Sequence, residues 1–324
     1  MKTEKKTQRN SNPYKHTDSN KRYFTYDYYL RQKLGGKCAK IPIDAGFSCP
    51  NIDGRCAIGG CIYCSARGSG DFAESAQLSI REQYDITRAK LSSKWSTERC
   101  IAYFQAHTNT YAPTDVLREK FEEALSLPGV VALNIATRAD CLEDSTVEYL
   151  AELAERTTLC VELGLQSSND AIAERINRGH DFAAFLDGYS RLRTASDKIQ
   201  ICVHIIFGLP GESRNEMLKT VADVAALKPD QVKIHLLHVL RGTPMADMYE
   251  RGEYLPLEKE EYVSLVVDAI ERLPEDTVVA RVTGDGMADD LLAPLWSMKK
   301  VSVINDIDKE LFGRNTWQGR LFGC

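Results

Sequence analysis

Four cysteines fall within sixteen residues of this chain, in the stretch Cys-Pro-Asn-Ile-Asp-Gly-Arg-Cys-Ala-Ile-Gly-Gly-Cys-Ile-Tyr-Cys that covers residues 49–64. Thiols at this density either form disulfides or bind a metal. The chain of 324 residues has no apolar signal segment, so we expect it to lie in the reducing cytoplasm, where disulfides are disfavoured. The spacing therefore predicts metal ligation.

The strongest unit within the stretch is Cys61-Ile62-Tyr63-Cys64, whose two intervening residues let both sulfurs face one ion or cluster. A third thiolate must come from Cys49 or Cys56. Zinc would take all four cysteines in a closed tetrahedral site, whereas an iron–sulfur cluster would take three and leave one iron open. The cysteine count alone favours zinc, and both interpretations stand at this point.

Nearly continuous apolar runs alternate with helical patterns over most of the chain, which is typical of a parallel sheet covered by helices. The strand-like runs are residues 40–44, 101–105, 130–136, 159–165, 200–207 and 231–237, and the helical patterns are residues 80–91, 114–125, 144–156, 169–192 and 216–227. These six units are too few for a closed eight-stranded barrel and predict an open one. Such barrels carry their sites at the carboxyl ends of the strands, and the cysteine stretch follows the first strand.

The pattern changes after residue 237 and divides the chain. Residues 257–273 read as a helix and 277–282 as a strand, without a further repeat. We expect a disordered basic tail over residues 1–20, a partial barrel over 21–240 and a C-terminal extension over 241–324 that packs on the barrel. No run of about 18 apolar residues is present, so a membrane span is not expected.

The cysteine stretch resembles the cluster loop of radical S-adenosylmethionine (SAM) enzymes, because an aromatic residue precedes its last cysteine and two glycines precede Cys61. Its long spacing resembles the elongator-protein-3-like branch. Cys-Pro-Asn, Gly-Gly-Cys and the following Ser69-Gly70-Asp71-Phe72 resemble a bacterial subfamily linked to tRNA wobble-uridine modification. The implied fold is a partial (β/α)6 radical SAM barrel with a C-terminal α/β extension.

The resemblance implies that Cys49, Cys61 and Cys64 bind a [4Fe–4S] cluster whose unligated iron chelates SAM. Electron transfer then splits SAM into methionine and a 5′-deoxyadenosyl radical, which takes a hydrogen atom from the substrate. Cys56 is expected to be a loop thiol, because a fourth ligand would close the iron that must hold SAM.

Polar residues near the strand ends are the candidates for SAM contacts. Gln105 and Asn109 stand where the family contacts the amino and carboxyl groups of SAM, although the usual Gly-Gly-Glu is absent and turn formation alone would also explain them. Glu162 interrupts an apolar strand, which costs several kcal/mol unless the carboxylate is satisfied. The resemblance assigns Glu162 to the SAM ribose, and the alternative is a buried pair with a lysine or arginine.

Further candidates come from loops on the same side of the predicted sheet. Gln166 extends the loop after Glu162, and Gly208 and Pro210 belong to a turn that resembles the family's approach to adenine. Four residues are weaker candidates for substrate binding, with a loop ion pair or a structural histidine as the alternative. They are Arg138, Arg175, His235 and His238.

The net charge of −5 conceals a basic N-terminal end, since residues 1–40 carry eleven Lys/Arg against three acidic residues. This end is either a solvated tail or an electrostatic arm for RNA. The resemblance implies a tRNA substrate whose wobble 5-carboxymethylaminomethyl(-2-thio)uridine becomes 5-aminomethyl(-2-thio)uridine. It also implies an electron donor such as flavodoxin or ferredoxin, and neither DNA nor a membrane as partner.

Two alternatives to this function stay open at this stage. One is radical SAM chemistry on a small metabolite. The other is a non-catalytic RNA-binding or sensing protein with an iron–sulfur cluster or zinc. The chain is too short for the acetyltransferase domain that accompanies elongator protein 3, so acetyl transfer is not expected.

Overall fold

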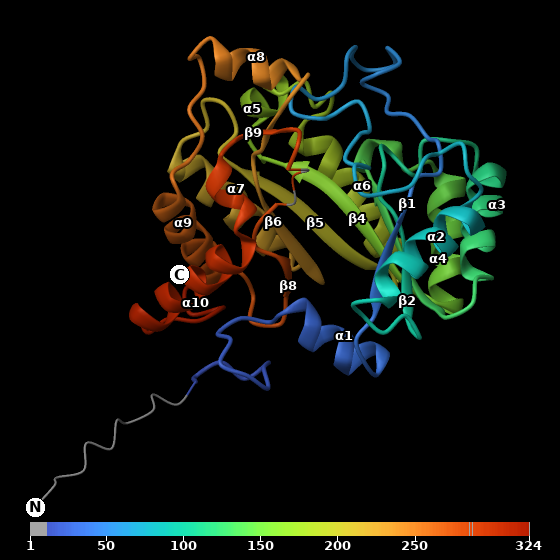
Figure 1. Cartoon of the computed structure of the whole chain (residues 1–324), viewed down its shortest axis with the longest axis horizontal. Coiled ribbons are helices and arrows are strands. Elements are labelled where there is room, and N and C mark those ends of the chain that lie inside the picture. Colours follow the sequence, from blue (N-terminus) through green and yellow to red (C-terminus); the bar gives the residue numbers. More distant parts are fainter. Residues whose placement is uncertain (1–11, 285, 287, 324) are drawn as a thin grey trace, which may run out of the picture.

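The protein is built on one curved parallel sheet, as the computed structural model of residues 12–284, 286 and 288–323 shows (Figure 1). The strand order is β1-β2-β3-β4-β5-β6-β8, and every neighbouring pair is parallel. The carboxyl ends of all these strands therefore meet at one rim. The strands are β1 Ala39–Ile43, β2 Cys100–Phe104, β3 Val130–Thr137, β4 Thr158–Gln166, β5 Gln200–Phe207, β6 Gln231–Leu236 and β8 Val278–Arg281.

Helices follow most strands and cover the outer face of the sheet (Figure 1). They are α1 Tyr26–Leu34, α2 Ile80–Ser92, α3 Thr114–Leu125, α4 Asp144–Arg156, α5 Asp170–Arg175, α6 Phe182–Ala195, α7 Arg214–Leu227, α8 Pro244–Glu250, α9 Lys259–Arg272 and α10 Lys300–Gly313, with 3₁₀ turns at Ala139–Cys141 and Leu295–Met298. A small antiparallel sheet joins β7 Val239–Leu240 to β9 Leu291–Ala293.

Alternate residues of each strand face opposite sides of the sheet. In β4 the odd-numbered residues Leu159, Val161, Leu163 and Leu165 pack in the main hydrophobic core under the helices. The even-numbered residues of the same strand point to the concave side, where Glu162 and Gln166 line a cavity. The same period of two holds in β5 and β6, so the helices bury the apolar face and the polar face lies inside the curve.

The α/β partial-barrel fold expected from the sequence is confirmed, with one correction to its composition. The sheet has seven strands instead of six, because β8 from the C-terminal extension pairs with β6 through Gln231 and Val278. The sequence predicts a strand over residues 277–282 but assigns it to the C-terminal extension. This assignment is wrong because a local pattern does not show to which sheet a strand belongs.

The N-terminal residues 12–20 pack against the C-terminal part of the chain, although a disordered tail was expected over residues 1–20. The hydroxyl of buried Tyr14 donates to the carbonyl of Glu275 at 2.6 Å. Just after this segment, Phe24 N–H donates to Gln318 Oε1 at 2.8 Å. The rest of the expected tail, residues 1–11, lies outside the described residues. In the described part of the chain, no helix has the length and apolar character needed to cross a bilayer.

Candidate active site

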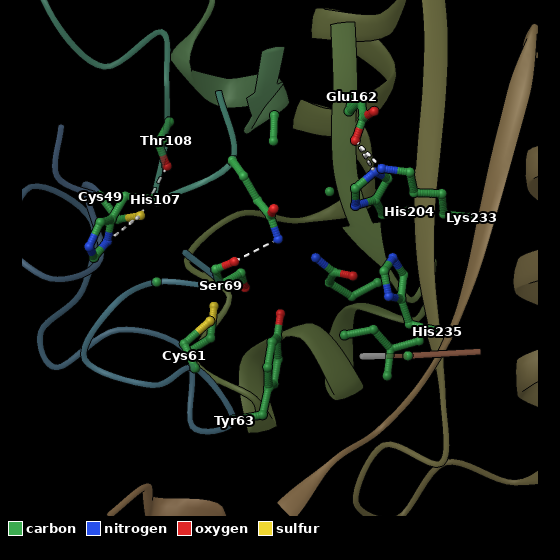
Figure 2. Close-up of a pocket in the computed structure, with 18 of the residues that line it drawn as sticks. Cys49, Cys61, Tyr63, Ser69, His107, Thr108, Glu162, His204, Lys233 and His235 are labelled. Carbon is green, nitrogen blue, oxygen red and sulfur yellow. Dashed lines mark hydrogen bonds and ion pairs between the residues drawn. The ribbon is translucent and has the colours of Figure 1, made fainter. Parts of the chain in front are cut away.

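The cysteine-rich loop and the strands of the barrel enclose a cavity of about 480 Å³ (Figure 2). Its mouth is formed by the loop, including Cys49, Cys61 and Cys64, and by residues at the carboxyl ends of the strands. Its floor is formed by inner-face side chains from the middle of the strands, among them Glu162 and Lys233. The cavity has the size of a typical small-molecule site.

The three cysteines expected to bind a cluster all line the mouth of this cavity. Cys61 and Cys64 belong to one tight turn, in which Cys64 N–H donates to Cys61 C=O at 3.0 Å. Cys49 Sγ lies 3.0 Å from Thr108 Oγ1 and 3.9 Å from His107 Nδ1. Within the described part of the chain, no group of three or more His, Cys, Asp or Glu side chains is gathered around a single metal position.

The sulfur of Cys61 is surrounded by donors. The Cys64 thiol hydrogen bond, the Arg178 charge and the Asn51 amide lower the pKa of Cys61 well below its ordinary value, against the effect of burial. Asn51 Nδ2 donates to Cys61 Sγ at 3.3 Å, and Arg178 Nη1 lies 4.0 Å from the same atom. Thiolate is the form that binds a metal or cluster, so this environment favours ligation by Cys61.

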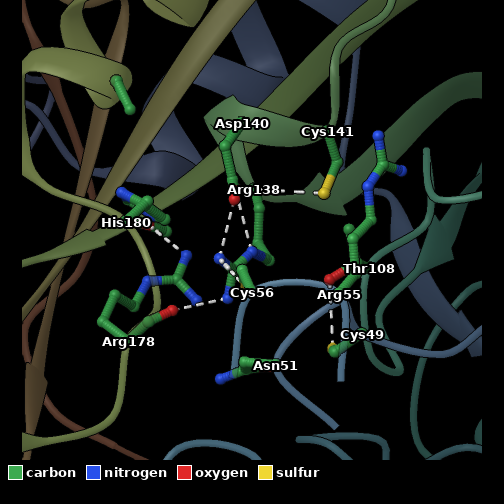
Figure 3. Close-up of polar contacts among 12 residues, drawn as sticks. Cys49, Asn51, Arg55, Cys56, Thr108, Arg138, Asp140, Cys141, Arg178 and His180 are labelled. Carbon is green, nitrogen blue, oxygen red and sulfur yellow. Dashed lines mark hydrogen bonds and ion pairs between the residues drawn. The ribbon is translucent and has the colours of Figure 1, made fainter. Parts of the chain in front are cut away.

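The fourth cysteine of the stretch, Cys56, lies beside Arg138 (Figure 3). Cys56 is exposed, does not line the cavity, and accepts a hydrogen bond from Arg138 Nη2 at 3.6 Å. A side chain at Gly179 would approach its sulfur to 2.8 Å, so the glycine makes room for it. This placement agrees with a loop thiol.

The floor of the cavity holds a fully buried carboxylate. Glu162 has no exposed side-chain area, and four groups satisfy its two oxygens. Lys233 Nζ and His204 Nε2 (3.0 Å) contact Oε2, whereas Lys40 Nζ (3.3 Å) and Asn134 Nδ2 (2.7 Å) contact Oε1. The pair with a lysine, which the sequence left as the alternative, is therefore the arrangement present. Both carboxylate oxygens are thus engaged by protein groups, and the contact of Glu162 with the SAM ribose stays a prediction.

The pKa values of the two lysines shift in opposite directions, although both lysines contact this carboxylate. Burial and the Lys40 charge lower the pKa of Lys233 to about 8, although Glu162 acts in the opposite direction. Burial also disfavours the charge of Lys40, but the Glu162 carboxylate outweighs it and raises the pKa of Lys40. Burial together with the Lys233 charge lowers the pKa of His204 to about 4, so its imidazole is neutral near pH 7.

Several polar atoms on the cavity wall are buried without a hydrogen-bond partner. They are Gln166 Oε1, Arg178 Nε, His235 Nε2 and His238 Nε2. Buried polar groups are normally satisfied, and unsatisfied ones cost about 1–3 kcal/mol each. Their concentration around one cavity indicates a site built for a polar ligand.

Five candidate residues outside the cysteine loop and Glu162 also line the cavity: Gln105, Gln166, Arg138, His235 and His238. Gln105 Nε2 donates to Ser69 C=O at 2.8 Å, which joins the strand end to the loop after the cysteines. Arg138 donates through Nε (2.9 Å) and Nη2 (2.8 Å) to Asp140, the loop pair given as its alternative (Figure 3). The Arg138 guanidinium is therefore held by an ion pair with a residue of the protein itself.

Four other candidates do not reach the cavity wall: Asn109, Arg175, Gly208 and Pro210. Asn109 is fully buried, and its amide donates to Ala106 C=O (3.0 Å) and Ala136 C=O (2.9 Å), so it closes a turn. Arg175 Nη1 donates to Pro210 C=O at 3.1 Å, which ties α5 to the glycine-rich turn. These residues shape the loops of the rim, as their turn-forming types alone would explain.

Sequence reasoning did not find three residues of the floor, which are Lys40, Tyr103 and His204. They could have been found in the sequence, because each is a polar residue within an otherwise apolar strand, at a position that faces the concave side. Lys233 Nζ lies 3.3 Å from Tyr103 Oη, and the ammonium of Lys40 stands 4.4 Å from the centre of the Tyr103 ring. Parallel strands place such residues together once the faces of the sheet are assigned.

The cavity fits the cofactors of a cluster-dependent enzyme. Thiols at its mouth are the ligands that iron–sulfur clusters take, and the donors on Cys61 stabilise a thiolate. The unpartnered oxygen of Gln166 offers a polar ligand a contact at the same end. An open parallel barrel with a cysteine loop after its first strand and a polar concave face defines the class of radical SAM enzymes.

The comparisons with known proteins agree with this class. Residues 51–224 match the Radical SAM superfamily and residues 229–312 match the Radical SAM C-terminal domain, so the chain belongs to the radical SAM superfamily. It is accordingly an enzyme, and its cofactors are a [4Fe–4S] cluster and SAM. The chain is 47% identical to the uncharacterized protein YtqA of Bacillus subtilis over 96% of each chain.

Two further similarities point to the elongator-protein-3-like branch. Over 48% of this chain and 28% of the relative, the sequence is 30% identical to a tRNA uridine(34) acetyltransferase of Methanocaldococcus jannaschii. The structure of Elp3 from Methanocaldococcus infernus, with residues 1–46 deleted, superposes with a TM-score of 0.65 at 19% identity. That superposition covers 87% of this chain and 64% of the other and shows the shared fold.

Proposed function

We propose that the enzyme modifies the wobble uridine of tRNA, converting 5-carboxymethylaminomethyl(-2-thio)uridine to 5-aminomethyl(-2-thio)uridine in the cytoplasm. The observation that carries this proposal is the similarity to a tRNA uridine(34) acetyltransferase, which by its name acts on the same nucleotide. The matched segment covers 28% of that relative, and acetyl transfer is not part of the proposal.

In this proposal Cys49, Cys61 and Cys64 hold the cluster, and Gln105 and Gln166 bind SAM at the mouth of the cavity. When bound, the cluster and SAM would supply a two-electron oxidation of the substituent's N–CH2 unit to an imine, with SAM reduced to methionine and 5′-deoxyadenosine, and hydrolysis of the imine by water would release the two-carbon unit as glyoxylate. The cysteine loop is held against the barrel by Asn51, whose Nδ2 donates to Asn177 C=O at 2.9 Å, and by Arg178, whose Nη1 lies 4.0 Å from Cys61 Sγ. An electron donor such as flavodoxin or ferredoxin completes the system.

The wobble base must leave the anticodon stack to enter a cavity of this kind, as other enzymes that act on bases require. His235 and His238 each present a buried, unpartnered Nε2 on the wall, and we assign them to the base and its substituent. Burial lowers the pKa of both imidazoles, that of His238 to about 4, so both are neutral near pH 7. Arg138 is engaged with Asp140 and donates through Nη1 to Arg178 C=O at 2.6 Å, so in this proposal it positions the part of the rim next to the cysteine loop.

Mass spectrometry of tRNA nucleosides from a strain that lacks the gene tests this function. We expect the carboxymethylaminomethyl nucleoside to accumulate and the aminomethyl form and its derivatives to disappear. A plasmid with the wild-type gene should restore the normal profile, whereas Cys61→Ser should not. An unchanged nucleoside profile in the deletion strain would remove tRNA as the substrate.

A further inference from the structure

The floor of the cavity carries more positive than negative charge in its ion-pair cluster. Lys40 and Lys233 both contact Glu162, which is the one carboxylate in this cluster. The side chain of Lys233 is 5% exposed and that of Lys40 is 26% exposed, so the two ammonium groups are largely removed from water. A buried charge without a full partner is costly, and one carboxylate cannot neutralise two cations.

Aromatic rings compensate for part of this excess charge. The Lys40 ammonium stands 4.4 Å from the ring centre of Tyr103 and 5.0 Å from that of Tyr26. The Lys233 ammonium stands 4.8 Å from the ring centre of Tyr103. Such contacts offset a fraction of an ion's lost hydration. The floor therefore keeps a positive potential that faces an open cavity. Burial and, in addition, the Lys40 charge lower the pKa of Lys233.

A second observation points to a ligand that reaches the floor. His235 follows Lys233 by two residues on β6, so both side chains lie on the inner face, and both line the cavity. The Nε2 atom of His235 is buried and has no hydrogen-bond partner. A neutral imidazole can donate to an anionic oxygen from this position. The cationic pair and the unpartnered imidazole together form a receptor for a small anion.

We propose that this floor binds the terminal carboxylate of the substrate's substituent, with Lys233 and His235 as the residues that select it. The inference rests on the proposed function and names the group by which the substrate is recognised. The inner-face positions of β4 set the depth of the site, because Gln166 lies at the rim and Glu162 lies four residues, or roughly 13 Å, below it. The carboxylate can therefore reach Lys233 only if the base itself enters the cavity past the rim, as the proposed function requires.

The methionine part of SAM also ends in a carboxylate, so the experiment must separate the two sources. The probes are two anticodon stem-loop RNAs that differ in one group. One carries carboxymethylaminomethyl-uridine at the wobble position, and the other carries the same substituent with the carboxylate replaced by a primary amide. Affinities of both RNAs, and of SAM separately, are measured under anaerobic conditions with the cluster-loaded wild type and the Lys233→Met variant.

We expect the wild type to bind the carboxylate RNA at least ten-fold more tightly than the amide RNA. Lys233→Met should reduce this preference to less than two-fold and leave the affinity for SAM unchanged. Lys219→Met is the matched control, because Lys219 is 66% exposed and pairs with Asp223 on the outer helix α7. If Lys233→Met does not fold, His235→Leu serves instead, since it removes the other selecting residue and leaves the Glu162–Lys233 pair in place, and the same loss of preference is expected.

Two results would overturn the inference. Equal affinity of the wild type for both RNAs would show that the carboxylate is not recognised, while the nucleoside profile of the deletion strain would still decide the proposed function independently. A large loss of SAM affinity in Lys233→Met, with the RNA preference intact, would assign the floor to the carboxylate of SAM.

Discussion

Glu162 and Lys233 form an ion pair across the inner face of the sheet, with 0% and 5% of their side chains exposed. The carboxylate comes from β4 and the ammonium from β6, and His204 of the intervening strand β5 contacts the same carboxylate. One strand therefore separates the two partners in the sheet. The pair spans the concave face, so it affects both the stability of the barrel and the charge of the cavity floor.

Substitution of Glu162 by Gln should strongly destabilise the protein. The variant leaves Lys40 and Lys233 buried beside each other without a carboxylate, and loss of one partner of a buried pair costs about 3–5 kcal/mol. The double variant Glu162→Gln/Lys233→Met should recover at least about 1 kcal/mol, because it removes one of the unpaired charges. Urea unfolding at pH 7 measures both.

The exposed pair Lys198–Glu155, with 56% and 57% of its side chains exposed, supplies the control for this cycle. Its removal by Lys198→Met and Glu155→Gln should change the free energy of unfolding by less than about 1 kcal/mol. If the double variant at Glu162 and Lys233 were as unstable as the sum of its single variants, the two residues would not be coupled and the interpretation of the pair would be wrong.

A second carboxylate, in the turn before α7, should make stability depend on pH. Burial raises the pKa of Glu212 to about 7, and a hydrogen bond from Ser167 opposes this only in part. The folded state therefore holds a proton that the unfolded state releases above its pKa near 4.3. Stability from this group is present at low pH and is lost as the pH rises from about 4.3 to about 7.

Glu212→Gln removes this dependence and should stabilise the protein above pH 7. We expect the difference in unfolding free energy between variant and wild type to grow by about 2–3 kcal/mol from pH 5 to pH 8. Urea unfolding at several pH values gives this difference directly. A difference that stays constant over this range would mean that Glu212 is ionised in the folded protein throughout.

The alternation of strands and helices, and thereby the fold, could be predicted from the sequence because both depend on local patterns. The expected helix over residues 169–192 is wrong, however, since the structure has α5 and α6 with a break between them. Asn177 adopts φ +55° in the break and donates from Nδ2 to Ile58 C=O (2.9 Å) and Gly60 C=O (2.6 Å). Residues in this break thus bind the cysteine loop. Such a tertiary contact cannot be predicted from the helical pattern of the segment.

The site was predictable in part for the same reason. Residues of the cysteine loop and polar residues at strand ends stand out in the sequence, and Gln105, Gln166, His235 and His238 do line the cavity. The partners of Glu162 come from four different strands, β1, β3, β5 and β6, so their convergence depends on register and curvature of the sheet. The sequence of one strand does not show which side chains of other strands its residues will contact.

The roles of the cysteines can be separated by substitution. Cys49→Ser, Cys61→Ser and Cys64→Ser should each abolish the cluster, because these residues line the cavity mouth. Cys56→Ser should keep it, because this thiol is exposed and lies outside the cavity wall. Iron analysis after anaerobic reconstitution should give about four irons per chain for the wild type and for Cys56→Ser. Stoichiometric zinc that is stable in air would contradict the assignment.

The basic N-terminal end should contribute to tRNA affinity. Residues 1–11 carry Lys2, Lys5, Lys6 and Arg9 against Glu4, whereas the whole chain has a net charge of −5. If these cations contact phosphates, each contact releases counterions, and the logarithm of the binding constant falls with the logarithm of salt by about 0.7–0.9 per contact. Deletion of residues 1–11 should therefore weaken tRNA binding and reduce the salt slope, by up to about 2.8–3.6 for four contacts.

The extent of the deletion decides how the result is interpreted. Removal of residues 1–20 would also remove Tyr14, whose hydroxyl donates to Glu275 C=O, so that variant should lose stability as well as tRNA affinity. The deletion of residues 1–11 leaves this contact in place, and thermal unfolding and SAM binding without tRNA should match the wild type. The measurement is tRNA binding by both variants and the wild type over a salt series. Superimposable curves for the wild type and the shorter deletion would place the RNA-binding surface on the folded domain.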